Sequence, residues 1–459
     1  AQISARIPAL RLVAFLAFVT AVGAGWGALR QRLLPAVAGA GALAVSGVAV
    51  AELYPAAVQR FQVQPNELAR ESLHIERAVQ ATRSGFGMAE LDRARYPYQS
   101  PTRADWDQAL DRMARLPVWT EKTLLQSFQQ VEARFPYYTF GHVTFDRYVA
   151  GDSVLPAAVA VREVAPSGIP LEGRNWQNLH LRERYVTGQG VVAGPSNRQD
   201  PEGRMPTWIA ALPPEFRGGP DIPDRLRMTR PQVHVGSRPQ GYAIVTPTEE
   251  AFRAPDGTPG VAGSDFPEGI RVGGFFRRAI LAWYFQDLDL LLSDEIGADS
   301  RLVFRRDAQA RVRALAPFLH LPQSPQAVLH EGRLVWIVEG YTVSRRYPLS
   351  VPHEVSPRLR VNWLRNGVKA TVDAVTGEVR LFAADAGALV LQGWMELFPG
   401  LVEPLDALDP GLADHLRYPD WYMERQSRVL LRFHQDAPAV FHGQQDRWAI
   451  PTESPHAQG

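Results

Sequence analysis

Two long uncharged apolar stretches open the chain and dominate its hydrophobic pattern. The first covers residues 12–29, and the second, rich in Ala, Gly and Val, covers residues 33–51. Because a helix rises about 1.5 Å per residue, each stretch is long enough to cross most of a bilayer core about 30 Å thick. The pattern predicts two transmembrane helices within residues 1–53. A cleaved signal peptide and a buried helical hairpin of a soluble protein stay open as alternatives.

The charges around these stretches indicate an orientation. Arg30 and Arg32 lie in the short connection, and positive residues are retained on the cytoplasmic side, so we expect the connection inside and everything after Glu52 outside. Arg6 and Arg11, before the first stretch, argue for the opposite orientation. The chain also begins at Ala1 and enters an apolar helix almost at once, which leads us to expect a piece of a longer protein with further spans upstream.

From Tyr54 onward apolar and polar residues mix, which predicts one large folded region over residues 54–459. Helical spacing of apolar residues is found at 66–92, 104–133 with a break at Pro117, 275–292 and 300–319. Strand-like stretches are found at 143–149, 157–164, 233–235, 242–246 and 334–343. The fold class we expect is therefore α+β, with the transmembrane helices followed by a mixed extracytoplasmic domain. A stretch dense in Gly and Pro at 247–274 predicts an internal seam.

The clearest local motif is a hairpin over residues 367–385. Apolar and polar residues alternate on both sides of Gly377, which supplies the positive φ that a tight turn needs. Lys369 and Asp373 share one face, and Arg365 lies just upstream. This polar face is either an ordinary solvent-exposed surface or the wall of a binding groove.

Composition narrows the classes of function. The 49 Lys and Arg residues nearly balance the 48 Asp and Glu residues, so we expect no nucleic-acid partner. The chain contains no Cys, which excludes disulfides, thiolate metal sites and a cysteine nucleophile. No serine-hydrolase elbow, zinc-protease motif, dinucleotide-binding motif or Walker A sequence is present, so the sequence predicts no cofactor and no defined catalytic set.

One acidic group offers hard oxygen ligands of the kind that Ca²⁺ prefers. Its members are Asp287, Asp289, Asp294, Glu295 and Asp299. Their spacing does not match an EF-hand loop, and such crowding usually means a solvated helix end. We expect Asp299 or Ser300 to cap the next helix. Asp256 and Asp265 form a weaker version of the same site. Among the histidines, His180 and His415 are candidates for a functional site, although each has an ordinary structural explanation.

Six strings, in order along the chain, resemble a known group. They are VQRFQVQPNEL (58–68), WQNLHLRERYVTGQGVV (176–192), DSRLVFRRDAQARVRALAPFL (299–319), GRLVWIVEGYTVSRRYPLS (332–350), NWLRNGVKATVDAVTGEV (362–379) and HLRYPDWYMERQ (415–426). The chain is similar to uncharacterised protein family 0182, bacterial membrane proteins with several N-terminal spans and a large extracytoplasmic domain. The resemblance implies multi-pass insertion with the folded region outward. It implies no catalytic residue.

The sequence is compatible with three functions. We expect first a protein of the bacterial cell membrane whose partners are the lipid bilayer and an envelope protein or polymer, in a binding or scaffolding role. The second is a cell-envelope hydrolase that uses paired carboxylates from the Asp287–Asp299 group or from the Asp373 face. The third is an accessory part of a transporter. The oligomeric state stays open.

Overall fold

The chain mixes helices and strands in a computed structural model that describes residues 5–31, 34–92, 94, 99–150, 153–218, 222, 226–245 and 268–451. It divides into two compact units. Unit 1 comprises Ala1–Ser84, Pro348–Val351 and Ser427–Gly459, and unit 2 comprises Gly85–Tyr347 and Pro352–Gln426. The predicted α+β character is confirmed. The boundary near residue 53 stays a prediction, as does the seam at 247–274, most of which lies outside the described residues.

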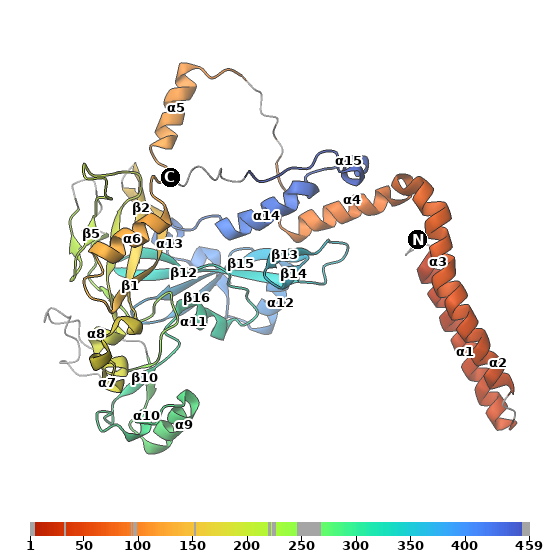
Figure 1. Ribbon diagram of the computed structural model, residues 1–459, viewed down its shortest axis with the longest axis horizontal. Helices are drawn as coiled ribbons and strands as arrows, with labels where there is room; N and C mark the ends of the chain where they lie inside the picture. The colour runs from red at the N-terminus through yellow and green to blue at the C-terminus, as the bar shows by residue number, and fades with distance from the viewer. Residues whose placement is uncertain are drawn as a thin grey trace. The chain divides into compact units, whose positions relative to one another are not determined.

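Unit 1 is helical. Figure 1 shows α1 (Ile7–Leu29) and α2 (Leu34–Val48) side by side as a hairpin. The second helix continues through two π-helical turns, Ala49–Leu53 and Gln59–Val63, which flank α3 (Tyr54–Val58), and then through a 3₁₀ turn, Gln64–Asn66, into α4 (Glu67–Gly85). A Cβ built at Gly39 would lie 2.7 Å from Thr20 Cγ2, so the small residue lets the two helices approach closely.

Both apolar stretches are therefore helical, and their side chains are hardly covered. In the helix Ile7–Leu29, 6% of the most apolar segment is buried inside the protein. In the continuous helix Ala36–Gly85, the corresponding share is 0%. By length and composition each helix can cross a membrane. Unit 1 also includes α15 (Pro438–Gly443). An ion pair within this unit joins Arg83 Nη1 to Asp436 Oδ1 at 2.5 Å.

Unit 2 contains two main sheets. The first has the order β1-β2-β4-β5-β6, and all its neighbours are antiparallel. Its strands are β1 (Tyr138–Ala150), β2 (Ser153–Val164), β4 (Val191–Pro195), β5 (Ile209–Ala210) and β6 (Glu215–Phe216). Helix α6 (Glu121–Val131) covers one face, where Leu124 and Phe128 pack against Phe140 and Val143. Thr120 caps this helix by accepting from the Thr123 amide at 3.2 Å.

The second sheet has the order β11-β12-β15-β16-β17, antiparallel except for its last pair. Its strands are β11 (Gln326–His330), β12 (Arg333–Ser344), β15 (Trp363–Asp373), β16 (Val379–Ala383) and β17 (Glu403–Pro404). Strands β15 and β16 form the predicted hairpin, and Gly377 has the predicted positive φ, 73°. One apolar core joins both sheets and includes Trp336, whose Nε1 donates to the Val235 carbonyl at 2.8 Å.

Smaller elements complete unit 2. A three-stranded sheet has the order β8-β10-β9, from β8 (Ala243–Val245), β9 (Ile270–Arg271) and β10 (Arg301–Val303). The two-stranded sheets pair β3 (Gly188–Gln189) with β7 (Gln232–Val233) and β13 (His353–Ser356) with β14 (Leu359–Val361). The remaining helices are α5 (Arg103–Met113), α7 (Trp176–His180), α8 (Glu183–Val186), α9 (Phe275–Phe285), α10 (Asp289–Leu292), α11 (Ala308–Leu315), α12 (Leu389–Leu397), α13 (Pro410–Ala413) and α14 (Asp420–Phe433), the last of which ends beyond unit 2.

A seam of side-chain hydrogen bonds joins the edge strands of the two main sheets. His142 Nε2 lies 2.7 Å from the Pro325 carbonyl, and Thr144 Oγ1 accepts from the Ala327 amide at 3.0 Å. Gln326 Nε2 donates to Asp146 Oδ2 at 3.0 Å, and the Leu329 amide donates to the Tyr148 hydroxyl at 3.0 Å. Every second residue of β1 therefore supplies a partner to the segment around β11. This pattern satisfies backbone groups that an edge strand would otherwise leave open.

The helix predicted at 300–319 is wrong in its first half. Residues Arg301–Val303 form β10, which pairs with β8 on one side and β9 on the other. The helix begins only at Ala308, where Asp307 caps it by accepting from the Ala310 amide at 2.6 Å. The cap predicted at Asp299 or Ser300 is therefore wrong, and strand pairing overrides the local helical spacing. The helix predicted at 275–292 is divided into α9 and α10 by Gln286, which has φ 55°.

Candidate functional site

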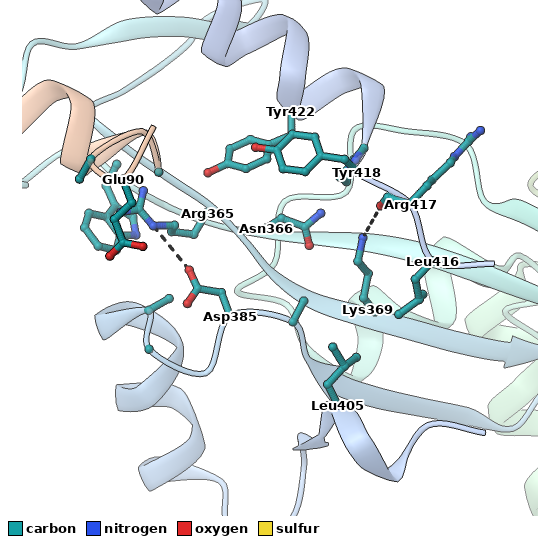
Figure 2. Close-up of a pocket in the computed structure, with 17 residues that line it drawn as sticks. Glu90, Arg365, Asn366, Lys369, Asp385, Leu405, Leu416, Arg417, Tyr418 and Tyr422 are labelled. Carbon is teal, nitrogen blue, oxygen red and sulfur yellow. Dashed lines mark hydrogen bonds and ion pairs between the residues drawn. The ribbon is translucent and has the colours of Figure 1, made fainter. Parts of the chain in front are cut away.

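A candidate site is a pocket of about 710 Å³ in unit 2. Four separate parts of the chain line it, around residues 87–90, 363–369, 384–388 and 416–422, together with Leu405. Figure 2 shows the side chains that face it. A cleft of this size, built from distant segments, is typical of a binding site for a small molecule or for part of a polymer.

An irregularity in β15 positions the polar side chains of one wall. Gly340 pairs with Val368 but Tyr341 pairs with Asn366, so Gly367 is the extra residue of a β-bulge. In a regular strand, residues three apart point to opposite faces. Here Asn366 and Lys369 both reach Glu339: Asn366 Nδ2 donates to Oε2 at 2.7 Å, and Lys369 Nζ lies 2.7 and 2.6 Å from the two carboxylate oxygens.

The same bulge places a second charged pair. The Gly367 carbonyl accepts from the amides of Ala384 and Asp385 at 2.9 and 3.4 Å, which brings the end of β16 to this wall. Asp385 Oδ2 then lies 3.5 Å from Arg365 Nε (Figure 2). The Arg365 guanidinium also lies 4.4 Å from the ring centroid of Trp363, a cation–π contact.

Two tyrosine rings also line the pocket. Tyr418 and Tyr422 stack with centroids 5.7 Å apart and an interplanar angle of 22°. Tyr418 is 58% exposed, whereas Tyr422 is buried and its hydroxyl lies within hydrogen-bonding distance of the Phe86 and Leu364 carbonyls. Gly87 permits this packing, since it has φ 72° and a Cβ there would lie 2.4 Å from the Tyr422 hydroxyl oxygen.

The cations of the pocket have partners within the protein. Lys369 pairs with Glu339, Arg365 pairs with Asp385, and Arg417 Nη1 donates to the Phe145 carbonyl at 2.8 Å. Burial lowers the pKa of Lys369, and the Glu339 carboxylate opposes that fall. Burial raises the pKa of Tyr422 and of Tyr418, so both hydroxyls are neutral at physiological pH. The pocket therefore has no strong excess of either charge.

Two buried polar atoms of strand β15, which lines the pocket, have no hydrogen-bond partner among the residues that the structure describes. They are the Asn366 Oδ1 acceptor and the Trp363 Nε1 donor. Such atoms cost free energy unless something outside the chain pairs with them. The bond from the Asn366 nitrogen to Glu339 sets the orientation of the amide, so its oxygen is the acceptor that has no partner.

The predicted acidic group does not line this pocket. Asp287 Oδ2 accepts from the Tyr242 hydroxyl at 2.5 Å and from Trp176 Nε1 at 3.0 Å. Asp289 is the first residue of α10, and Glu295 pairs with Arg182 at 3.1 Å. Asp294 and Asp299 are exposed. The calcium site stays a prediction, and its weaker version, Asp256 and Asp265, lies outside the described residues.

A different trio has metal-ligand proximity. Within the described part of the chain, the His330, Glu331 and Asp409 ligand atoms all lie within 4.8 Å of one another, and no other such group of three is present there. His330 Nε2 lies 3.4 Å from Asp409 Oδ1, which also caps α13. The two carboxylates are exposed, so ordinary surface pairing explains this group.

Both candidate histidines lie outside the lining of the pocket. The His180 ring stacks on Tyr242 at 4.0 Å between centroids, and burial lowers its pKa. His415 is buried between two groups of β1, with Nδ1 2.8 Å from Asp146 Oδ2 and its ring 4.7 Å from that of Tyr148. These contacts fit the ordinary structural explanation of both residues, and a functional role for either stays a prediction.

The polar face predicted on the hairpin is only partly in the site. Arg365 and Lys369 line the pocket, which supports the interpretation as a groove wall. Asp373 does not line it, because its carboxylate pairs with Arg333 at 3.2 Å and accepts from the turn amides of Val375 and Thr376. Several side chains in or beside the candidate site were not predicted from the sequence: Glu90, Glu339, Asn366, Asp385, Tyr418 and Tyr422. The paired aromatic residues in RYPDWY were the available signal.

Comparisons with known proteins agree on one family. The model of the uncharacterised protein family UPF0182 matches residues 1–458. UPF0182 proteins of Pelotomaculum thermopropionicum, Cupriavidus necator and Kineococcus radiotolerans are 30%, 32% and 34% identical to the chain over 98%, 97% and 96% of its length. The chain spans about half the length of these relatives, since the matches cover 48%, 48% and 44% of them. No solved structure matches the chain significantly. The chain belongs to the uncharacterised protein family UPF0182.

Proposed function

We propose that the chain is a membrane-anchored binding protein of the bacterial envelope. Its helix α1 has 23 residues, a length of about 35 Å, which exceeds the hydrocarbon thickness of a bilayer. Large apolar side chains of both helices, such as Phe18 and Leu34, are exposed to the surroundings. Burial in lipid stabilises such surfaces, whereas water does not.

The proposed orientation places residues 54–459 outside the cytoplasm. Arg30 lies in the connection between α1 and α2, and positive charge there favours a cytoplasmic connection. The absence of Cys makes this orientation simple to test. With Gln31→Cys as the single thiol, a membrane-impermeant maleimide should label permeabilised cells and leave intact spheroplasts unlabelled. Labelling of intact spheroplasts would reverse the proposed orientation.

For the pocket we propose an uncharged, polyhydroxylated ligand, such as a segment of an envelope saccharide. The observation that carries this proposal is the unpaired Asn366 Oδ1 acceptor in a pocket walled by the exposed Tyr418 ring. A sugar hydroxyl can donate to that oxygen while the apolar face of the sugar ring packs on the tyrosine. The internal pairing of Arg365 and Lys369 argues against an anion as the principal ligand.

Saturation-transfer NMR on the full chain in nanodiscs tests this ligand class. The probes are the tetrasaccharide of N-acetylglucosamine and a tetrasaccharide of a uronic acid, which adds charge to the same chemistry. We expect the neutral probe to bind better, and Tyr418→Ala to weaken it roughly 3- to 10-fold, as the loss of one aromatic contact predicts. Trp106→Ala, an exposed aromatic residue outside the pocket, is the control. Equal binding by Tyr418→Ala, or no binding of the neutral probe, would contradict the proposal.

A hydrolase of the same ligand is the second candidate. Two carboxylates from distant segments, Glu90 and Asp385, line the pocket, as paired acid and base residues would. A hydrolase at this pocket would therefore use Glu90 and Asp385. The Asp287–Asp299 group and Asp373, which were predicted from the sequence for this role, do not line the pocket. Slow cleavage of the neutral tetrasaccharide that disappears in both Glu90→Gln and Asp385→Asn would favour it over binding alone.

A further inference from the structure

An exposed apolar surface of unit 2 lies on two consecutive helices, α9 and α10, and on the turn between them. Seven large apolar side chains there are each between 60% and 80% exposed. We call them the α9 surface: Phe275, Phe276, Ile280, Trp283, Tyr284, Leu288 and Leu292. Scattered exposed apolar residues are normal in soluble proteins, but Phe276, Ile280 and Tyr284 follow one another at four-residue spacing and share one side of α9. Such a group marks a place where something else binds.

The opposite side of α9 already faces the protein core. Ala282 is buried, and Leu281 and Phe285 pack with it against Tyr242 and Leu302. Arg278 fixes the second helix, since its Nε donates to the Leu290 carbonyl at 3.1 Å and its Nη2 donates to the Ser293 carbonyl at 2.6 Å. The α9 surface is therefore the outer side of a preformed helix pair.

The composition of the surface fits the interface of a lipid bilayer. Four of its seven side chains are aromatic, and Trp283 and Tyr284 are of the two types that favour the headgroup level. Helices with one apolar side and a charged flank, here Arg277, lie in the interface plane with the apolar side inserted. Two apolar helices on the same chain would hold this surface at high local concentration beside a membrane.

We propose that the α9 surface inserts into the headgroup–acyl boundary of a lipid bilayer as a second, monotopic membrane contact. This inference rests on the proposed membrane anchoring, but not on the proposed ligand of the pocket. Exposed Asp289, Asp294 and Glu295 flank the surface, so apolar burial rather than attraction to anionic lipid drives the contact. Insertion is accordingly insensitive to salt and similar in vesicles of phosphatidylcholine with or without phosphatidylglycerol.

Single-cysteine labelling of the full chain tests the contact, because the chain has no native Cys. Three variants, Phe276→Cys, Leu171→Cys and Val22→Cys, are labelled with an environment-sensitive fluorophore and reconstituted in phosphatidylcholine vesicles. Leu171 is the matched control, since it is 79% exposed and lies outside the α9 surface. Val22 lies in α1 and reports on the anchoring alone.

Lipids with a spin label at the top of the acyl chain should quench most of the emission at position 276 and little at position 171. Quenching at position 22 without quenching at 276 overturns this inference and leaves the anchoring intact. Quenching at 276 alone overturns the anchoring, and with it the description of the α9 surface as a second membrane contact. A blue shift at 276 without lipid quenching overturns the inference in favour of a protein partner, and oxidative cross-linking of Phe276→Cys then shows whether that partner is a second copy.

Discussion

Replacing Lys369 with methionine removes the cation from a buried pair at the centre of the candidate pocket. The side chains of Lys369 and Glu339 are only 8% and 12% exposed, and two contacts of 2.6 and 2.7 Å join the ammonium to the carboxylate. After the substitution, the Glu339 carboxylate stays in a poorly solvated site without its counterion. Among the residues that the structure describes, its remaining strong donor is Asn366 Nδ2 at 2.7 Å.

The size of the effect follows from the cost of an unpaired buried charge. Removal of one partner of a buried ion pair lowers the free energy of unfolding by about 3–5 kcal/mol, and the surviving Asn366 bond places Lys369→Met near the lower end, at about 3 kcal/mol. The double variant Lys369→Met/Glu339→Gln carries no unpaired charge, so we expect it to recover most of this loss. Arg380→Met is the matched control, since Arg380 and Glu403 also lie 2.6 Å apart but are 41% and 35% exposed. It should cost less than about 1 kcal/mol.

Urea unfolding of the full chain in detergent, followed by tryptophan fluorescence, measures these differences. Trp336 and Trp363 are buried in unit 2 and report on its unfolding. The reasoning is refuted if Lys369→Met shifts the unfolding midpoint no more than Arg380→Met does. It is also refuted if the double variant is less stable than Lys369→Met, because the penalty would then not come from the unpaired carboxylate.

Three further results are expected. Burial and the nearby Arg306 hold the pKa of His234 well below its ordinary value, so the unfolded state binds a proton there more readily than the folded state does. This histidine therefore lowers the free energy of unfolding by about 1.4 kcal/mol for each pH unit below pH ~6.5. In denaturation measured between pH 7 and 5, His234→Gln should reduce the dependence of stability on pH by one proton. Tyr148→Phe leaves the Leu329 amide without that acceptor and should cost about 1–3 kcal/mol in the same urea assay, whereas Tyr284→Phe, at an exposed site, should cost almost nothing. Gly87→Ala should displace Tyr422 and abolish binding of the neutral tetrasaccharide, whereas Gly203→Ala, with φ 77° and nothing within 4 Å of its Cβ, controls for backbone strain and should retain binding.

The sequence predicts the elements whose pattern is local. Alternation around Gly377 predicts the β15–β16 hairpin, and the break at Pro117 separates α5 from α6. The segment 300–307 was wrongly predicted to be helical because apolar residues alternate there with the pair Arg305 and Arg306, as on an amphipathic helix. Arg306 is instead buried, with Nε 3.0 Å from the His234 carbonyl, and the preceding strand is held between two others. Pairing with strands distant in the sequence determines the conformation of this segment, and the periodicity of the segment carries no information about that pairing.

The candidate site was harder to predict than the fold because its walls come from distant segments. Lys369 and Arg365 were recognised on one polar face, but strict alternation places Asn366 on the other. The extra residue at Gly367 changes that assignment, and only the register with β12 reveals it. Glu339 and Tyr418 lie far from this strand in the sequence, so no local spacing connects them with it.

The seam between β1 and β11 makes the register of β1 unusually intolerant of length changes. Thr144, Asp146 and Tyr148 reach their partners because they alternate along one strand. One residue inserted between His142 and Thr144 would turn all three side chains toward α6 and send apolar neighbours to the seam. The backbone of β11 would then lose its acceptors and become a free edge, to which a strand of another molecule could add. Insertions and deletions within this strand should therefore produce aggregation rather than a merely weakened fold.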